Sequence, residues 1–316
     1  MDFENVLIKK NNRFEILGFP VLEMPMQGKN YFSINPFLPD SLNRCPLGCL
    51  YCLSQKDFWN KDYHIFNNKI LPPNLIQTLV NYILDSKAGR KGFPIAVLDY
   101  SDPFLPIHQN RLLETIAALR HRNAVNIFYV TTKLHPGVNF LNKIKSSFLK
   151  SRLKPVVLVS LSPLQPGLEK VSVSDRVRLI KDLVKLKIPS CWYIRPLVQE
   201  WFYHEMLTDL VHDIAPCIKN NIIISSLIMT KSIEENLIAN DIDVPVWDDT
   251  MNGEKLLLPE TFEKNVRSQI INIGKKVGIN IDSILSHRIC AANRYLNFAC
   301  KVCQPQDRRF CQGYIE

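Results

Sequence analysis

Three cysteines near the amino end of the chain have a spacing that suits metal chemistry. Cys45, Cys49 and Cys52 form a CxxxCxxC pattern, and Gly48 permits the tight turn that would bring their sulfurs together. Three thiolates can hold a [4Fe–4S] cluster that keeps one iron open for a substrate or cofactor, whereas clusters that only carry electrons normally have four cysteine ligands. A zinc site completed by a histidine, with His64 the nearest, and three structural cysteines are the alternatives.

A second group of cysteines lies at the carboxyl end of the chain. Four thiols occur there with the spacing C-x9-C-x2-C-x7-C: Cys290, Cys300, Cys303 and Cys311. This set fits a second [4Fe–4S] cluster or a tetrahedral zinc site, with disulfides or free thiols as the alternative. Because few apolar residues separate these cysteines, we expect a bound metal to order the segment. Cys191 and Cys217 stand alone, and we expect both to be buried as small hydrophobic residues.

Two alternating patterns predict the elements that must position the first cysteine group. Short runs of β-branched and aromatic residues predict buried strands, and longer segments with helical spacing separate them. The predicted strands cover residues 30–34, 95–100, 126–131, 155–161, 190–194 and 221–227, and the predicted helices cover 74–84, 109–120, 138–148, 174–186, 205–214 and 259–277. This βα repetition predicts an α/β protein with a parallel sheet, and six strands fall short of a complete barrel. We therefore expect a partial (β/α)6 barrel of the TIM type with a Cys-rich carboxyl-terminal extension.

The same patterns divide the chain into four parts. We expect a lead at residues 1–28, the partial barrel at 29–230, a helical and loop extension at 231–289, and a metal-binding tail at 290–316. The contents, 46% hydrophobic and 22% charged residues, exclude a wholly disordered chain. No apolar run approaches the ~20 residues of a membrane span, and no apolar signal region opens the chain. We therefore expect a cytoplasmic protein without membrane contact.

Polar side chains follow the predicted strands at their carboxyl ends, where barrels of this kind carry their chemistry. Ser101 and Asp102 follow the second strand, Lys133 the third and Arg195 the fifth, while Ser160 ends the fourth. A carboxylate is bound by cations and hydroxyls, and an ammonium group by acceptors, so this set suits a polar, zwitterionic ligand. A turn at Asp102, a solvated Lys133 and strand packing of Ser160 are the ordinary alternatives.

Two further side chains have an open placement. Arg176 is expected on the exposed or rim side of a helix, from where it could reach a ribose or carboxylate. Trp201 follows the fifth predicted strand, where it could stack on a substrate, although the buried start of the next helix is slightly favoured.

The first cysteine group, with Tyr51 directly before the last cysteine, resembles the motif of the radical S-adenosylmethionine superfamily. This resemblance implies an open iron that binds the amino and carboxylate groups of S-adenosylmethionine. It also implies cleavage of that cofactor to methionine and a 5′-deoxyadenosyl radical, which abstracts hydrogen from a substrate. The implied cofactors are one [4Fe–4S] cluster and S-adenosylmethionine, and the implied partner is an external one-electron reductant of the flavodoxin or ferredoxin type.

A closer resemblance is to the spore photoproduct lyase-like branch, over about residues 29–228. The lead FSINP at 32–36, the stretch SDPFLP at 101–106, the Thr-Lys pair ending at Lys133 and the strand-end Ser160 are similar to the pattern of that branch. The resemblance implies that Ser101 and Asp102 hold the amino group of the cofactor, and that Lys133 and Ser160 hold its carboxylate. We place Tyr51 and Arg195 in the same cofactor-binding set.

One departure separates this chain from the spore photoproduct lyases proper. Those enzymes use a barrel cysteine to return a hydrogen atom to the product, but no cysteine occurs here between Cys52 and Cys191. Cys191 lies at the start of a predicted strand, away from the end that carries the chemistry. DNA photoproduct repair is therefore not expected.

The charge of the chain leaves two function classes open. The net charge is +9, from 39 basic and 30 acidic residues, and the densest basic runs are short: 9–13, 120–122, 150–154 and 308–309. Such charge attracts nucleic acid, and solvated lysines of a soluble protein explain it equally well. A radical enzyme acting on an unidentified substrate, with nucleic acid or nucleotide as one candidate class, is favoured. The alternatives are a non-catalytic nucleic-acid-binding protein with two metal modules and an electron-transfer protein, and neither gains from an incomplete three-cysteine set.

Overall fold

The computed structural model describes residues 7–16, 19–25, 31–37, 45–52, 71–218, 221–227, 229–246, 260–281 and 284. The strands are β1 (Leu7–Lys10), β2 (Arg13–Ile16), β3 (Phe19–Glu23), β4 (Phe32–Ile34), β5 (Ile95–Val97), β6 (Ile127–Thr132), β7 (Lys154–Ser160), β8 (Ser190–Ile194) and β9 (Ile222–Ile224). The helices are α2 (Leu75–Asp85), α3 (Lys87–Arg90), α4 (Pro106–His121), α5 (Val138–Ser147), α6 (Val173–Lys185), α7 (His204–Ile218), α8 (Lys231–Ile238) and α9 (Glu260–Lys276). His64 and the four carboxyl-terminal cysteines lie outside the described residues, so the metal site of the tail stays a prediction.

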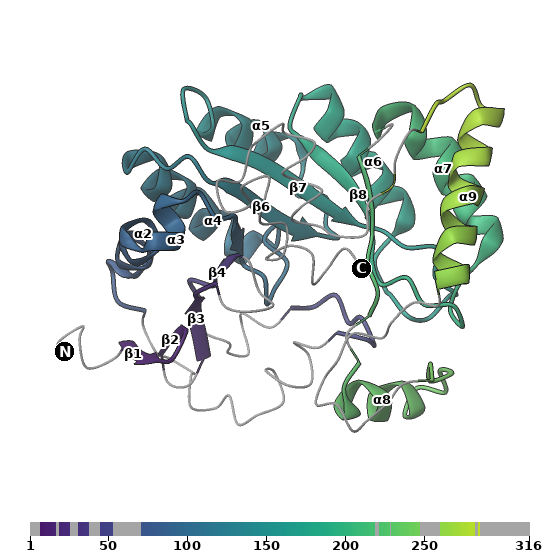
Figure 1. The fold of residues 1–316 in the computed structure, drawn as a ribbon, viewed down its shortest axis with the longest axis horizontal. Helices are drawn as coiled ribbons and strands as arrows, with labels where there is room; N and C mark the ends of the chain where they lie inside the picture. Colours follow the sequence, from purple (N-terminus) through teal and green to yellow (C-terminus); the bar gives the residue numbers. More distant parts are fainter. Residues whose placement is uncertain are drawn as a thin grey trace, which may run out of the picture.

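All described strands belong to one nine-stranded sheet in which neighbours follow the chain order from β1 to β9. The first four strands pair antiparallel, and β4 to β9 pair parallel. The six parallel strands are the six that the sequence predicts, and a helix follows most of them (Figure 1). The chain therefore has a mixed α/β fold, and the predicted parallel sheet is confirmed. Among the described residues no pairing joins β9 to β1 or β4, so closure into a barrel is not seen.

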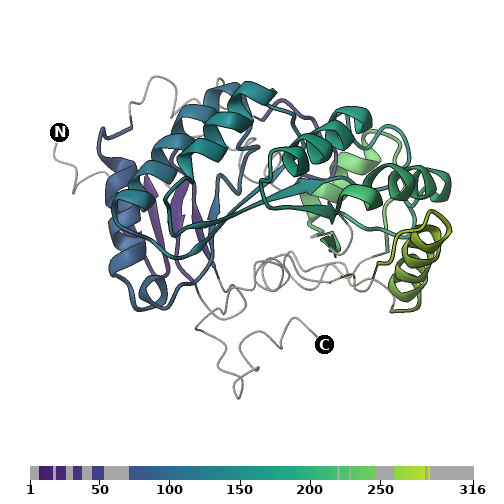
Figure 2. The same cartoon turned by 90° about the horizontal axis from the view of Figure 1, so that it is seen from above.

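Alternation along the parallel strands gives the sheet two buried faces. On β6, Phe128 and Val130 pack into the main core with the helices, whereas Ile127 and Tyr129 belong to a smaller cluster on the opposite face. The helices of the main core lie along one side of the sheet (Figure 2). Burial on both faces explains why these strands are continuous apolar runs in the sequence. Cys191 joins the smaller cluster with 2% exposure, which confirms its prediction as a buried hydrophobic residue.

The amino-terminal strands β1 to β3 extend this sheet beyond its parallel part, at the purple end of the ribbon in Figure 1. The hydrophobic pattern does not predict these strands because each is only 4 or 5 residues long and carries charged residues. Glu15 of β2 is buried and forms ion pairs with Lys10 and Arg13. A polar residue therefore occupies a core position here, which the hydrophobic pattern alone cannot reveal.

No helix among the described residues is long and apolar enough to cross a membrane, as the sequence predicts.

Candidate functional site

The three-cysteine loop lies at the carboxyl ends of the parallel strands, where two other segments hold it. The backbone N–H of Leu50 donates to the carbonyl of Leu168 at 3.2 Å, and the Asn236 amide donates to the carbonyl of Leu50 at 2.6 Å. These bonds tie the loop to the segment after β7 and to α8. Gly48 has a φ of +60°, and a Cβ there would lie 3.3 Å from the Lys170 side chain. The predicted need for glycine at this turn is therefore confirmed.

The cysteine side chains of this loop are largely withdrawn from solvent. Cys45 and Cys49 are buried and Cys52 is partly exposed. Burial raises the pKa of the Cys45 thiol to about 12, and it raises the pKa of Cys49 to about 11 although Lys133 acts against it. Without a metal, both thiols are therefore protonated at neutral pH. A metal must displace these protons to bind, which is the ordinary coupling between metal binding and thiol ionisation.

The three thiols of this loop are candidate ligands for a cluster or for a single metal ion. Among the described residues, no three His, Cys, Asp or Glu side chains stand close enough together to hold one metal ion. A cubane cluster offers a separate iron to each thiolate, so its ligands stand further apart than those of one ion. Lys133 and Arg176 act on Cys49 as nearby positive charges, which would offset the charge of ligating thiolates.

Asp102 links the ends of β5 and β6. Its Oδ1 accepts from the Thr132 hydroxyl at 2.7 Å and from the Phe104 N–H at 2.9 Å, and its Oδ2 accepts from the Lys133 N–H at 2.7 Å. Burial raises the pKa of Asp102 to about 6, although these hydrogen bonds favour the carboxylate and limit the rise. The bond to Phe104 has the form of an Asx turn, as the ordinary alternative proposed. The same carboxylate also fixes the backbone of Lys133.

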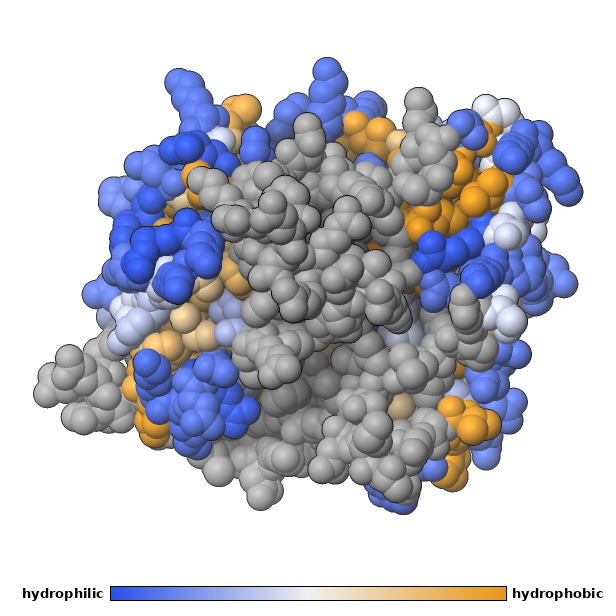
Figure 3. Space-filling view, viewed as in Figure 1, coloured by the Kyte–Doolittle hydropathy of each residue, from blue (hydrophilic) through white to orange (hydrophobic). Residues whose placement is uncertain are grey.

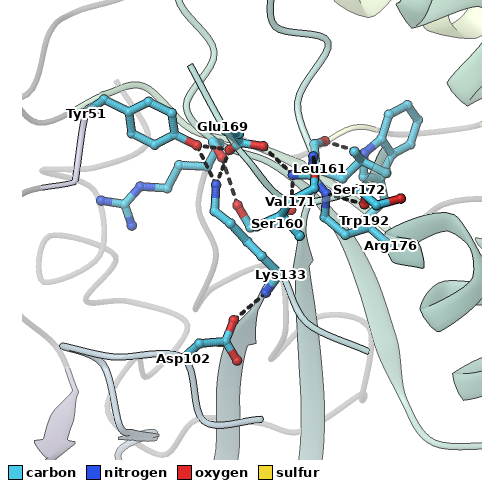
Figure 4. A network of polar contacts seen from close by, with 11 residues as sticks. Tyr51, Asp102, Lys133, Ser160, Leu161, Glu169, Val171, Ser172, Arg176 and Trp192 are labelled. Carbon is cyan, nitrogen blue, oxygen red and sulfur yellow. Dashed lines mark hydrogen bonds and ion pairs between the residues drawn. The ribbon is translucent and has the colours of Figure 1, made fainter. Parts of the chain in front are cut away.

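The Lys133 side chain reaches back to the cysteine loop (Figure 4). Its ammonium donates to the Tyr51 hydroxyl and forms an ion pair with Oε1 of Glu169, and the Tyr51 hydroxyl donates to that same oxygen. The ammonium also lies 4.9 Å from the centre of the Tyr51 ring. Burial lowers the pKa of Lys133 to about 8. Lys133 is therefore not a solvated loop lysine, and it lies beside Tyr51 of the cysteine motif.

Arg176 holds Glu169 from the other side, at the carboxyl end of β7, and its predicted exposed position is wrong. The side chain is 2% exposed and forms an ion pair with Oε2 of Glu169. It also donates to the carbonyls of Ser160 at 3.1 Å, Val171 at 3.2 Å and Ser172 at 3.4 Å. The helix is amphipathic by pattern, but its first turn lies against the loop after β7, and this tertiary contact encloses the guanidinium. The guanidinium N–H donors of Arg176 are therefore used in contacts within the protein.

Glu169 is the residue that the sequence analysis missed. Its carboxylate joins Tyr51, Lys133 and Arg176, which come from three separate segments. Burial raises the pKa of Glu169, and the Arg176 guanidinium acts in the opposite direction. The available signal was a carboxylate in a strand-to-helix loop at the chemical end of the sheet. Nothing in the sequence says that this carboxylate turns inward.

The other predicted site residues lie further from this group. The Ser160 hydroxyl donates to the carbonyl of Arg195 at 2.9 Å, so it fixes backbone. The Arg195 guanidinium donates to the Tyr193 hydroxyl at 3.3 Å and lies 5.9 Å from the centre of that ring. The Ser101 hydroxyl pairs with Nε2 of His108 at 3.0 Å. The structure therefore gathers Tyr51, Asp102 and Lys133, and among the described residues Arg176 connects Ser160 to them.

Trp201 packs against the cysteine loop. Its side chain is fully buried, its indole N–H donates to the carbonyl of Asp243 at 2.8 Å, and its ring lies 6.0 Å from that of Tyr51. The preference for a buried Trp201 is therefore confirmed.

No family model matches the chain, and no curated protein matches its sequence. Among solved structures, the fold is similar to that of SuiB from Streptococcus suis bound to S-adenosylmethionine, with a TM-score of 0.52 and 13% identity, covering 84% of this chain and 52% of that chain. Another structure of SuiB gives a TM-score of 0.49 and 11% identity, covering 83% and 51%. The chain thus spans about half the length of the structures it matches. At this identity the likeness concerns the fold alone.

Proposed function

We propose that this chain is a radical S-adenosylmethionine enzyme built on a partial (β/α)6 barrel. The observation that carries the proposal is the contact of Lys133 and Tyr51 beside the CxxxCxxC loop, at the carboxyl ends of parallel strands. The fold supports it, because SuiB, which shares this fold, was crystallised with S-adenosylmethionine. A bound and reduced cluster would supply the electron that cleaves the cofactor to methionine and a 5′-deoxyadenosyl radical. The hydrogen donor is an unidentified substrate.

The cluster ligands in this proposal are Cys45, Cys49 and Cys52. Their loop is fixed by hydrogen bonds to two other segments, so the thiols are held before metal arrives. Burial of Cys45 and Cys49 excludes water from these two ligands, and the positive charges of Lys133 and Arg176 favour the ionised form of Cys49. Cluster chemistry therefore fits the residues that are present.

Lys133 is proposed to bind the cofactor carboxylate. An ammonium group has three donors, and the described contacts of Lys133 use two of them, on Tyr51 and Glu169. The remaining donor can meet a ligand carboxylate. Arg176 and Glu169 do not need to touch the cofactor in this arrangement, because they position Lys133. Arg176 fixes Glu169, and Glu169 fixes the ammonium.

The other cofactor contacts remain proposals. Ser101 and Asp102 would hold the amino group, and Ser160 and Arg195 would complete the carboxylate end. Asp102 already accepts three hydrogen bonds, so it contributes mainly through the one lone-pair position left to it. The four tail cysteines would hold a second [4Fe–4S] cluster or zinc. In this proposal the chain is divided into a partial barrel at residues 29–230 and a metal-binding tail at residues 290–316, with the extension between them. A flavodoxin- or ferredoxin-type protein would supply the electron.

The experiment is anaerobic reconstitution of the full chain with iron and sulfide. We expect S-adenosylmethionine and dithionite to yield 5′-deoxyadenosine and methionine in the wild type. A triple variant, Cys45→Ala with Cys49→Ala and Cys52→Ala, should yield neither, whereas Cys217→Ala should behave as wild type because that thiol packs against the core. Release of 5′-deoxyadenosine by the triple variant would overturn the proposal.

A further inference from the structure

The basic runs that are scattered through the sequence meet at one end of the sheet. The loops that lead into β5, β6, β7 and β8 enter neighbouring parallel strands, so they lie side by side at the amino ends of these strands. They and the helix ends before them carry exposed cations at eleven positions: Lys87, Arg90, Lys91, Arg120, Arg122, Lys145, Lys150, Arg152, Lys154, Lys185 and Lys187. We call these eleven residues the basic rim. Figure 3 shows hydrophilic residues, basic and acidic alike, along the upper, left and right margins of the described surface.

Side-chain contacts join three of the four loops of the basic rim. Arg120 at the end of α4 donates to the carbonyl of Ser147 at the end of α5, at 3.5 Å. Arg122 reaches in the other direction and forms an ion pair with Asp85 of α2 at 2.7 Å. Arg90 donates to the backbone carbonyl of that same Asp85. The loops before β5, β6 and β7 are therefore in contact at their outer ends.

The β1–β2 turn extends the same surface. Lys9, Lys10 and Arg13 flank this turn, and the Phe14 ring beside it lies 4.4 Å from the ring of Tyr82 in α2. Tyr82 stands one residue from Asn81, to which Arg122 donates. Three of the four dense basic runs in the sequence thus converge here, and the fourth, at 308–309, lies outside the described residues.

The charge of the basic rim is almost uncompensated. Within the described part of the chain, Arg122 alone among the eleven has a carboxylate partner, and that partner, Asp85, is exposed. Cations in the last turn of a helix complement the helix dipole, which accounts for Arg120, Lys145 and Lys185. It does not account for the cations in the loops beyond the helix ends. Positive charges gathered on one surface destabilise the folded protein through mutual repulsion, so the cations in these loops need another explanation.

We propose that the basic rim binds the phosphate backbone of a nucleic acid. Neighbouring helices pack about 10 Å apart, so the four loops span roughly 30 Å. A duplex of that length carries about 18 phosphate charges, one per ~1.7 Å of helix axis when both strands are counted. Exposed lysine and arginine side chains can bind backbone phosphates, and such contacts do not recognise the base sequence. This binding is independent of the cofactor chemistry proposed above.

The position of the basic rim argues against a redox protein as its partner. β7 has 7 residues, so at ~3.3 Å per residue its two ends lie roughly 20 Å apart. The cysteine loop lies at the opposite end, and electron tunnelling falls off exponentially with distance. A reductant docked on the basic rim would be badly placed, whereas a nucleic acid needs no proximity to the cysteines in order to bind.

Fluorescence anisotropy with labelled duplexes of about 20 base pairs, one of RNA and one of DNA, tests the proposal. We expect log affinity to fall steeply with log salt for the wild-type chain. The variant Lys150→Glu, Arg152→Glu, Lys154→Glu removes three cations of the basic rim. It should bind on the order of 100-fold more weakly near 0.1 M salt, with a salt slope smaller by about 2 to 3. The RNA and DNA arms identify which backbone is preferred.

The matched control reverses three exposed cations outside the basic rim: Arg178→Glu, Lys181→Glu and Lys231→Glu on α6 and α8. Circular dichroism should show both triple variants folded. Equal weakening by the two variants would overturn the proposal, since net charge and not this surface would then explain binding. Labelled polyglutamate serves as an acidic peptide. Binding of polyglutamate as tight as that of the duplexes would assign the basic rim to an acidic protein and overturn the nucleic-acid assignment.

Discussion

The two ends of the parallel strands carry their charges in different ways. At the carboxyl ends, Arg176 is buried, Lys133 and Glu169 are partly buried, and all three are paired across different segments of the chain. At the amino ends, the cations of the basic rim are exposed, and Arg122 alone among these described residues has an acidic partner. Buried charges are costly unless every one is paired, whereas exposed charges stay hydrated and cost little. The first arrangement therefore fixes geometry, and the second provides an attractive field.

This difference gives the two ends different sensitivities to mutation. Removal of one member of a buried pair leaves an uncompensated charge in the core, which costs about 3–5 kcal/mol. Removal of an exposed cation changes stability by about 0.5 kcal/mol or less. Affinity for a ligand at the basic rim depends on the total charge of the surface, and the loss of a single cation changes it little.

The largest expected effect is on stability. Arg176→Leu should lower the free energy of unfolding by about 3–5 kcal/mol, because Glu169 and three backbone carbonyls lose their buried donor. Arg152→Leu, at an exposed arginine of the basic rim, should change it by about 0.5 kcal/mol or less. Urea unfolding of both variants measures the difference. Equal effects would mean that the two ends do not differ as described.

The next effect is on cofactor binding. Lys133→Ala should weaken binding of S-adenosylmethionine to the reconstituted chain by about 10- to 150-fold, from the loss of a charge-assisted hydrogen bond of about 1.5–3 kcal/mol. The absorption spectrum of the cluster should stay as in the wild type. Lys181→Ala, an exposed lysine on α6, is the control and should bind normally. An unchanged dissociation constant for Lys133→Ala would remove this lysine from the cofactor site.

Glu169→Gln should have a smaller effect, about 10-fold weaker binding of S-adenosylmethionine, because the ammonium of Lys133 loses its fixed carboxylate partner. An analogue of the cofactor that lacks the carboxylate distinguishes positioning from structural damage. The variant should bind this analogue as the wild type does, since the analogue has no carboxylate for Lys133 to bind. Weaker binding of both ligands would mean that Glu169 only supports the fold.

The smallest effect is a dependence on pH. Burial lowers the pKa of Lys133 to about 8, so the ammonium that binds the carboxylate is fully charged below this value and is lost as pH rises through it. Affinity for S-adenosylmethionine should therefore fall about twofold between pH 7 and pH 8, and further above pH 8. Titration calorimetry measures this. Lys133→Arg keeps its charge and should abolish the decline, even if a different geometry weakens binding overall.

The parts of this protein that depend on local pattern could be predicted from the amino-acid sequence. The six parallel strands were predictable because both of their faces are buried, so each is an apolar run. The CxxxCxxC motif with Tyr51, and the strand-end positions of Asp102 and Lys133, were predictable because spacing and polarity along the chain locate them. The buried Cys191 follows from the same logic.

The pairing and grouping of charges could not be predicted, because both depend on contacts between distant segments of the folded chain. Tyr51 and Glu169 are 118 residues apart in the sequence, and an amphipathic pattern cannot show that Arg176 turns inward to join them. Strands β1 to β3 escaped prediction because each is short and carries charged residues, and in β2 Glu15 occupies a core position through ion pairs. The basic runs are short and scattered in the sequence, and they form one surface because consecutive parallel strands place their entry loops side by side. Contacts between distant segments, unlike periodicity, leave no local signal in the chain.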